Sequence, residues 1–148
     1  MLCPVCKCHL IVLELDQVEM DYCASCNGIW LDPGELELLL HMGNARPGPL
    51  SHALRTGGHK VWGQKRRCPV CRSKMLQVEV KGPPRVTVDR CRYGHGLWLD
   101  DRELGQLIEA AGGTHDAGAL GRFCGRLFKG RRAPAQGDKD HVGTDSGQ

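Results

Sequence analysis

The sequence predicts a small, metal-stabilised α+β fold made of two tandem copies of one unit. Its 148 residues include only two Phe, two Tyr and three Trp, beside twenty Gly and eight Pro, so one large apolar core is not expected. Seven of its nine cysteines follow a repeated spacing. Units of about 40 residues usually need a metal or disulfides to remain folded.

The repeat extends from the first cysteine pair of each copy to a helix. Cys3 and Cys6 recur 65 residues later as Cys68 and Cys71, whereas Cys23 and the Trp-Leu-Asp motif at 30–32 recur 68 residues later. The shift of three residues is an insertion between two predicted strands, a position that tolerates added length. The repeat therefore sets the architecture.

Each copy predicts a β-hairpin. The first copy has candidate strands at 10–15 and 18–23, and the second has them at 75–80 and 85–91. The last of these alternates in polarity and is rich in Val, which is typical of a strand with one buried face.

A short helix is expected after each hairpin. Asp32, Pro33 and Glu35 predict a helix start, with Asp as the N-cap acceptor, Pro at the first helical position and Glu completing a capping box. Asp100 and Glu103 repeat the box without the proline. The helices are expected over 33–42 and 101–111, each ending near glycine.

These features divide the chain into five segments. Between the copies, the sequence is rich in Gly, Pro and cations, which indicates a linker with a short helical turn at 50–55. The expected segments are ribbon 1 at 1–42, a basic Gly/Pro-rich linker at 43–65, ribbon 2 at 66–112, an amphipathic basic helix at 113–132 and a disordered tail at 133–148.

The amphipathic segment places apolar side chains on one helical face, with arginines and lysine elsewhere on the wheel. We expect it to fold back and cover apolar surface of a ribbon. Docking with a partner helix and binding to a membrane surface are the alternatives. The apolar positions are Leu120, Phe123, Cys124, Leu127 and Phe128.

The cysteine spacing predicts two zinc ions per chain. Two C-x2-C turns brought together by a hairpin supply four tetrahedral ligands, as zinc requires. The predicted ligands of the first ion are Cys3, Cys6, Cys23 and Cys26.

The second site has only three cysteines in the repeated pattern, Cys68, Cys71 and Cys91. His95 lies one residue beyond the position of Cys26 in the first copy, and Gly94 and Gly96 allow the turn to adjust. We expect His95 to close this site. Recruitment of another group, or a water in an open position, remains an alternative.

An open site would permit zinc hydrolysis, but it would also need a base. The nearest downstream carboxylates, Asp100 and Glu103, have counterparts in Asp32 and Glu35 beside a complete four-cysteine site. Helix capping explains both pairs. The sequence therefore predicts no enzyme activity and no catalytic residue.

Two stretches carry a family resemblance: CPVC followed by VEMDYCASCNGIWLDPGELELLL, and CPVC followed by VTVDRCRYGHGLWLDDREL. They resemble the TFIIB-type, or transcription-factor, zinc-ribbon family of small bacterial proteins, over about 1–42 and 66–110. The resemblance implies two zinc ribbons, each followed by a short helix, with the ligands named above, His95 included through its Gly-His-Gly context. The chain departs from the family in having Lys7 and Arg72, where glycine is more usual.

Four other residues have competing interpretations. Trp30 and Trp98 are expected to pack the helix onto the hairpin, although an aromatic this close to a ligand could stack on a nucleobase. Cys8 aligns with Ser73 and is expected to be a spare thiol, with an alternative-ligand or redox role less favoured. Cys124 is expected to act as a small buried hydrophobe.

Charge is distributed unevenly along the chain. Seven thiolates and two zinc ions would cancel the formal net charge of +3. Residues 1–45 hold one Lys and seven acids, whereas 46–92 hold twelve Lys or Arg and two acids. An anionic partner is therefore expected to contact 46–92, although such a run is more often a solvated linker.

The sequence has no run of 18 apolar residues, and its start, MLCPVCKCHL, lacks a basic leader followed by an apolar stretch. We therefore expect no transmembrane segment and a cytoplasmic location. The favoured function is a non-catalytic, zinc-binding interaction module with a protein or nucleic-acid partner. A zinc-dependent hydrolase or redox protein, and a zinc buffer or sensor, are the alternatives.

Overall fold

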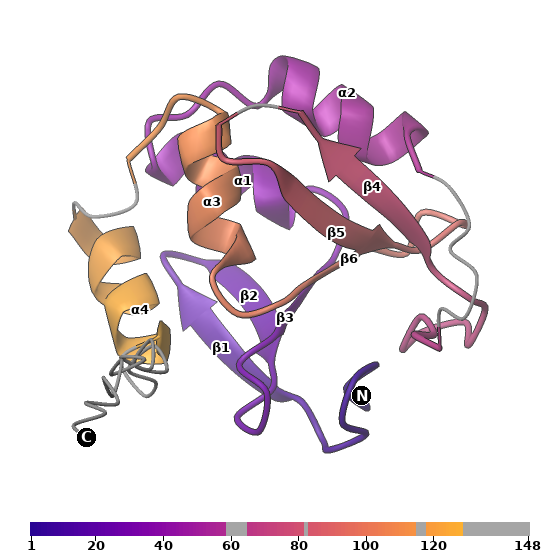
Figure 1. Ribbon diagram of the computed structural model, residues 1–148. Helices are drawn as coiled ribbons and strands as arrows, with labels where there is room; N and C mark the ends of the chain where they lie inside the picture. Colours follow the sequence, from indigo (N-terminus) through magenta and orange to yellow (C-terminus); the bar gives the residue numbers. More distant parts are fainter. Residues whose placement is uncertain (59–64, 82, 115–117, 129–148) are drawn as a thin grey trace, which may run out of the picture.

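A computed structural model describes residues 1–58, 65–81, 83–114 and 118–128. The predicted tail at 133–148 lies outside this range. In the described part, both copies form a strand pair, a short third strand and a helix (Figure 1). The strands are β1 (Ile11–Leu15), β2 (Val18–Tyr22), β3 (Ile29–Leu31), β4 (Leu76–Val80), β5 (Val86–Arg90) and β6 (Leu97–Leu99). The helices are α1 (Glu35–Met42), α2 (Gly48–Thr56), α3 (Glu103–Ala110) and α4 (Gly118–Phe128).

The six strands form one antiparallel sheet in the order β1-β2-β3-β6-β5-β4. The two copies meet at the centre, where Trp30 pairs with Trp98 and the flanking residues of β3 and β6 pair symmetrically. Although a Gly- and Pro-rich segment separates the two copies in the sequence, the backbone hydrogen bonds of each short third strand are completed by the other copy. The two ribbons are halves of one sheet.

Alternation along β3 and β6 assigns the two faces of the sheet to two cores. Ile29 and Leu31 of β3, like Leu99 of β6, belong to a core shared with all four helices. Trp30 and Trp98 belong to a second core that contains Leu10, Met75 and the cysteines of both clusters. Because successive side chains of a strand point to opposite faces, the two tryptophans lie on the face of the sheet that carries the cysteines of both clusters.

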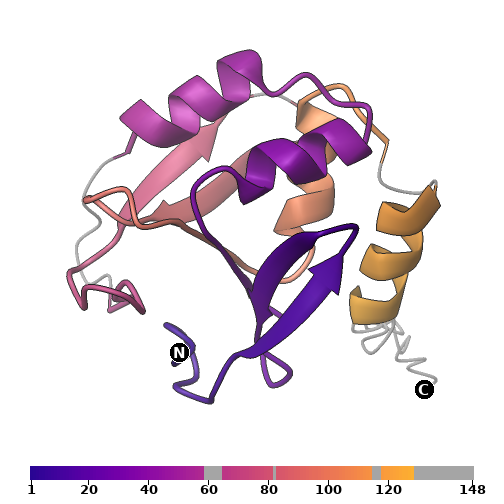
Figure 2. The same cartoon turned by 180° about the vertical axis from the view of Figure 1, so that it is seen from behind.

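The second helix, α2, lies inside the segment predicted to be a linker. Its Leu50 and Leu54 are buried in the helix-side core. Figure 2 shows α2 packed beside α1 and above the strands of the second copy. The predicted helical turn at 50–55 is thus a full helix, because its spaced leucines have apolar surface to cover despite the Gly- and Pro-rich composition. The expected division of the chain at 43–65 remains a prediction.

The C-terminal helix α4 contacts β1. Its Leu120 and Cys124 are buried in the helix-side core, and Phe123 packs against that core. The prediction that this segment folds back over a ribbon is confirmed for these three residues, and Cys124 is the buried small hydrophobe that its position predicted.

Candidate metal centres

The first cluster is built from two tight turns that precede and follow the β1–β2 hairpin. The Sγ atoms of Cys3 and Cys26 are 3.6 Å apart, and those of Cys6 and Cys23 are 3.3 Å apart. The first turn is closed by the amide of Cys3, which donates to the carbonyl of Cys8 at 2.8 Å. All four sulfurs lie within 4.8 Å of one another.

The second cluster repeats this arrangement with one exchange of ligand type. The Sγ atoms of Cys71 and Cys91 are 3.6 Å apart, and Nδ1 of His95 lies 3.5 Å from Sγ of Cys91. Together with Cys68, these residues place four potential ligand atoms within 4.8 Å of one another. The structure therefore brings His95 to the position that the missing fourth cysteine would fill.

The backbone around His95 explains how the exchange is accommodated. Gly94 and Gly96 have φ values of +77° and +150°, a region that favours glycine. In the first copy, Asn27 takes the place of His95 in the repeat and accepts a hydrogen bond from the hydroxyl of Tyr22 at 2.7 Å. The two glycines thus allow the later turn to direct its imidazole to the cluster.

Lys7 and Arg72 occupy the turn positions where the resemblance leads one to expect glycine. Both adopt the left-handed conformation, with φ values of 65° and 63°. The conformation of the turn is kept, although the residue is not glycine.

The donor sets fit zinc. A Zn–S bond of about 2.3 Å places the sulfurs of a tetrahedral site about 3.8 Å apart, close to the distances found here. None of the nine cysteines, all of which fall in the described ranges, forms a disulfide. Cys8, exposed and with its Sγ directed to the carbonyl of Cys6 at 4.0 Å, stands outside the first cluster.

The thiols within each cluster differ in their proton affinity. Burial raises the pKa of Cys68 to about 12, while a hydrogen bond from Ser73 lowers the pKa of Cys71 to about 6. In the first cluster, burial raises the pKa of Cys3, and the backbone amide of Cys8 lowers the pKa of Cys6 to about 6. A metal that binds either cluster must displace protons from its buried thiols.

Trp30 and Trp98 are completely buried, so neither ring is accessible to a nucleobase. Each indole lies against the other copy: a Cβ on Gly28 would overlap the ring of Trp98, and one on Gly96 would overlap the ring of Trp30. The glycine two residues before each tryptophan therefore makes room for the tryptophan ring of the other copy. The tryptophans join the two ribbons, rather than packing a helix onto its own hairpin.

The capping prediction for Asp32 and Asp100 is wrong. Their Oδ1 atoms accept hydrogen bonds from the indole Nε1 of Trp30 and Trp98, at 2.8 and 2.9 Å, and neither helix has a side-chain N-cap. The buried indole N–H needs an acceptor, and the aspartate two residues later supplies it.

The glutamate half of each predicted capping box is present. Glu35 accepts the amide of Asp32, and Glu103 accepts the amide of Asp100, both at 2.7 Å. These carboxylates therefore hold the turn that leads from the third strand of each copy into its helix.

Arg66 forms an ion-pair network that is not predictable from the sequence pattern. Its guanidinium pairs with Asp89 and, at 2.8 Å, with Asp100. Asp89 is only 2% exposed, so this arginine neutralises a buried carboxylate. Arg66 is consequently engaged inside the protein and is not one of the cations available to an anionic partner.

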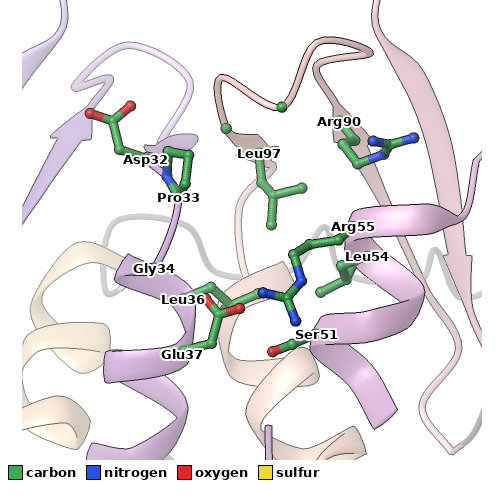
Figure 3. Close-up of a pocket in the computed structure, with 12 residues that line it drawn as sticks. Asp32, Pro33, Gly34, Leu36, Glu37, Ser51, Leu54, Arg55, Arg90 and Leu97 are labelled. Atoms are coloured by element: carbon green, nitrogen blue, oxygen red, sulfur yellow. The ribbon is translucent and has the colours of Figure 1, made fainter. Parts of the chain in front are cut away.

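A cavity of about 460 Å³ lies between α1, α2 and the segment that enters β6. Figure 3 shows Arg55 reaching from α2 toward Glu37 of α1 across an apolar floor that includes Leu36 and Leu54. Oγ of Ser51, which lines this cavity, is buried and has no hydrogen-bond partner among the described residues. The sequence does not predict this cavity, because the segment that forms α2 has the composition of a linker.

A comparison with protein families identifies the two repeated units. The sequence model of the family described as "Transcription factor zinc-finger" matches residues 2–42 and 67–110, which together make up more than half of the chain. The chain belongs to this zinc-ribbon family. Neither the curated proteins nor the solved structures contain a match.

Family and geometry together establish a tandem zinc-ribbon protein whose two clusters fit two Zn²⁺ ions. A protein built from zinc ribbons is a zinc-binding module. None of the helices in the described part of the chain has the length and apolar character that crossing a bilayer requires.

Proposed function

We propose that the protein is a non-catalytic interaction module in which two structural zinc ions fix the surfaces offered to a protein or nucleic-acid partner, in a transcription-related role. The observation that supports this is the closed donor set of each cluster. Sites with four protein ligands are typical of structural zinc, whereas catalytic sites keep a position for water or substrate. The proposed ligands are Cys3, Cys6, Cys23 and Cys26 for one ion and Cys68, Cys71, Cys91 and His95 for the other.

The side chains near the second cluster support a structural role. Asp100, the nearest downstream acid, accepts from Trp98 and pairs with Arg66. Glu103 accepts the amide of Asp100. Both carboxylates are occupied by contacts that hold the protein together, so a hydrolase would need to break these contacts to obtain a base.

A reducing compartment such as the cytoplasm suits this proposal. Nine cysteines without a disulfide are typical of chains that are kept reduced. Ligand thiols must also be reduced to bind zinc.

The assignment of the second centre is tested by replacing its histidine. We expect native mass spectrometry to find two zinc ions in the wild type and at most one in His95→Ala, because three cysteines alone form an incomplete structural site. His41→Ala is the matched control, since His41 is exposed on α1 and outside both clusters. Two ions of unchanged affinity in His95→Ala would contradict the assignment.

A further inference from the structure

The two copies present different side chains around equivalent metal clusters. Each cluster is enclosed by a first turn, at 3–6 or 68–71, and a second turn, at 23–26 or 91–95. Five positions in or beside these turns carry different residues in the two copies, and all but one of these pairs differ in charge or aromatic character. In the order second copy and first copy, they are Arg67 and Leu2, Arg72 and Lys7, Lys74 and His9, Arg92 and Ala24, and Tyr93 and Ser25.

We call the five positions of the second copy the second knuckle surface. All five side chains are exposed, and four of them are cations. Residues 67–74 and 91–96 contain no acidic residue. The corresponding turns of the first copy carry only Lys7 as a permanent cation, and their cluster has one more thiolate, so the first knuckle is much less positive.

The fold brings the cations to one place. Arg67 and Lys74 face each other in an isolated β-bridge, and Arg67 donates to the carbonyl of Arg72 at 3.0 Å. Arg92 follows Cys91 directly, and the sulfurs of Cys91 and Cys71 are 3.6 Å apart. Within the described ranges, none of the four cations forms an ion pair shorter than 4.0 Å.

Tyr93 adds an aromatic ring to this basic surface. Tyr93 is 67% exposed, the largest value among the exposed large hydrophobic residues in the described ranges. The backbone amide of Tyr93 donates to Sγ of Cys91 at 3.4 Å, which ties the residue to the cluster. Another molecule that covered the exposed ring of Tyr93 would remove apolar surface from water, which favours binding.

We propose that the second knuckle surface binds single-stranded nucleic acid, with its four cations on phosphates and Tyr93 stacked on a base. This rests on the proposed role as an interaction module and names its partner. Exposed aromatic rings among cations are typical of single-strand binding, because an unpaired base offers its face to the ring. A duplex keeps its bases stacked, and an acidic protein offers charge without a planar base.

The test measures binding of the full zinc-loaded chain to a fluorescein-labelled oligothymidine of about 20 nucleotides, a length that exceeds usual site sizes. The variant Arg92→Ala/Tyr93→Ser carries the residues that the first copy has at the corresponding positions of its turn, Ala24 and Ser25. We expect its affinity to fall at least about tenfold by fluorescence anisotropy. The control Lys7→Gln, on the first knuckle, should leave affinity within about twofold.

Stacking and charge are separated by two further measurements. Tyr93→Phe should retain wild-type affinity, whereas Tyr93→Ser should lose about fivefold or more. Lys74→His, which also carries the first-copy residue, should reduce the slope of log affinity against log salt by about 0.7 at a pH where histidine is neutral.

Three outcomes would overturn the proposal: an oligothymidine that does not bind, equal binding by Arg92→Ala/Tyr93→Ser and wild type, or equally effective competition by duplex or by polyglutamate. Native mass spectrometry of the same samples keeps this result separate from the proposed function. Two bound zinc ions without oligonucleotide binding would refute the nucleic-acid surface alone. Loss of zinc from the wild type would contradict the zinc-organised module as well.

Discussion

At the scale of single residues, some side chains make hydrogen bonds other than those that local sequence rules predict. Asp32 and Asp100 have the type and position of N-caps, yet each accepts from an indole. The N-cap position instead belongs to Gly34 in the first copy and to Arg102 in the second, both in the left-handed conformation. Sequence spacing alone could not predict this choice, because it depends on where the tryptophan is buried.

Glu103 provides a residue-scale prediction about pH. Burial raises the pKa of its carboxyl to about 7, although the bond from the Asp100 amide opposes the rise. The pKa of Glu103 in the folded protein exceeds its unfolded value of 4.5, so protonation of Glu103 favours the folded state. The stability that this group contributes is full below about pH 4.5 and is lost as the pH rises through about 7.

We therefore expect Glu103→Gln to become stabilising relative to wild type as the pH rises from 5.5 to 8, by about 1 to 2 kcal/mol after allowance for solvent screening. Glutamine keeps an acceptor for the amide without a charge. Denaturant unfolding of the two zinc-loaded proteins at each pH measures the difference, in which the common effect of pH on zinc binding cancels. A difference that is constant with pH would contradict the raised pKa.

At the scale of elements, the repeat and the periodicity predicted the hairpins and the following helices to within two residues. The helices begin two residues later than expected, at Glu35 and Glu103. The third strands were missed because three residues inside a ligand motif are too short to show alternation. The ligand clusters were predictable because zinc constrains residue type and spacing together.

Helix α2 was not predicted in full because its glycine and proline outweighed two spaced leucines. In the structure, α2 contributes buried side chains to the core. Mutation of one of its buried leucines tests this contribution. We expect Leu54→Ala to lower the free energy of unfolding by about 2 to 5 kcal/mol, as for other buried leucines. Leu54 is 2% exposed.

The matched control is Leu38→Ala, since Leu38 is 52% exposed on α1. It should change stability by less than about 0.5 kcal/mol. Both values come from denaturant unfolding of zinc-loaded protein. Equal effects for the two variants would show that α2 is dispensable and that the segment is the linker its composition suggested.

At the scale of the whole molecule, two features join the halves of the chain. β3 pairs with β6, and the tryptophan of each copy covers the glycine of the other. These contacts join residues far apart in the sequence, so no local pattern in either copy could predict them. Together with the two cores, they predict a single cooperative unit rather than two independent ribbons.

Zinc is expected to contribute most of the stability of that unit. Structural zinc sites supply on the order of 10 to 16 kcal/mol, comparable to the whole stability of a typical domain. Loss of the second ion would release β6, and with it the covering of Trp30 and the pairing of β3. The first ribbon should then lose its order although its own four cysteines are intact.

Two zinc centres and one shared sheet should make a single folding unit, and heteronuclear NMR of zinc-loaded Cys91→Ala tests this most directly. We predict that the indole N–H resonance of Trp30, in the intact first copy, loses its native chemical shift together with that of Trp98. A native Trp30 resonance in this variant, with the amides of residues 1–42 unchanged, would contradict the claim.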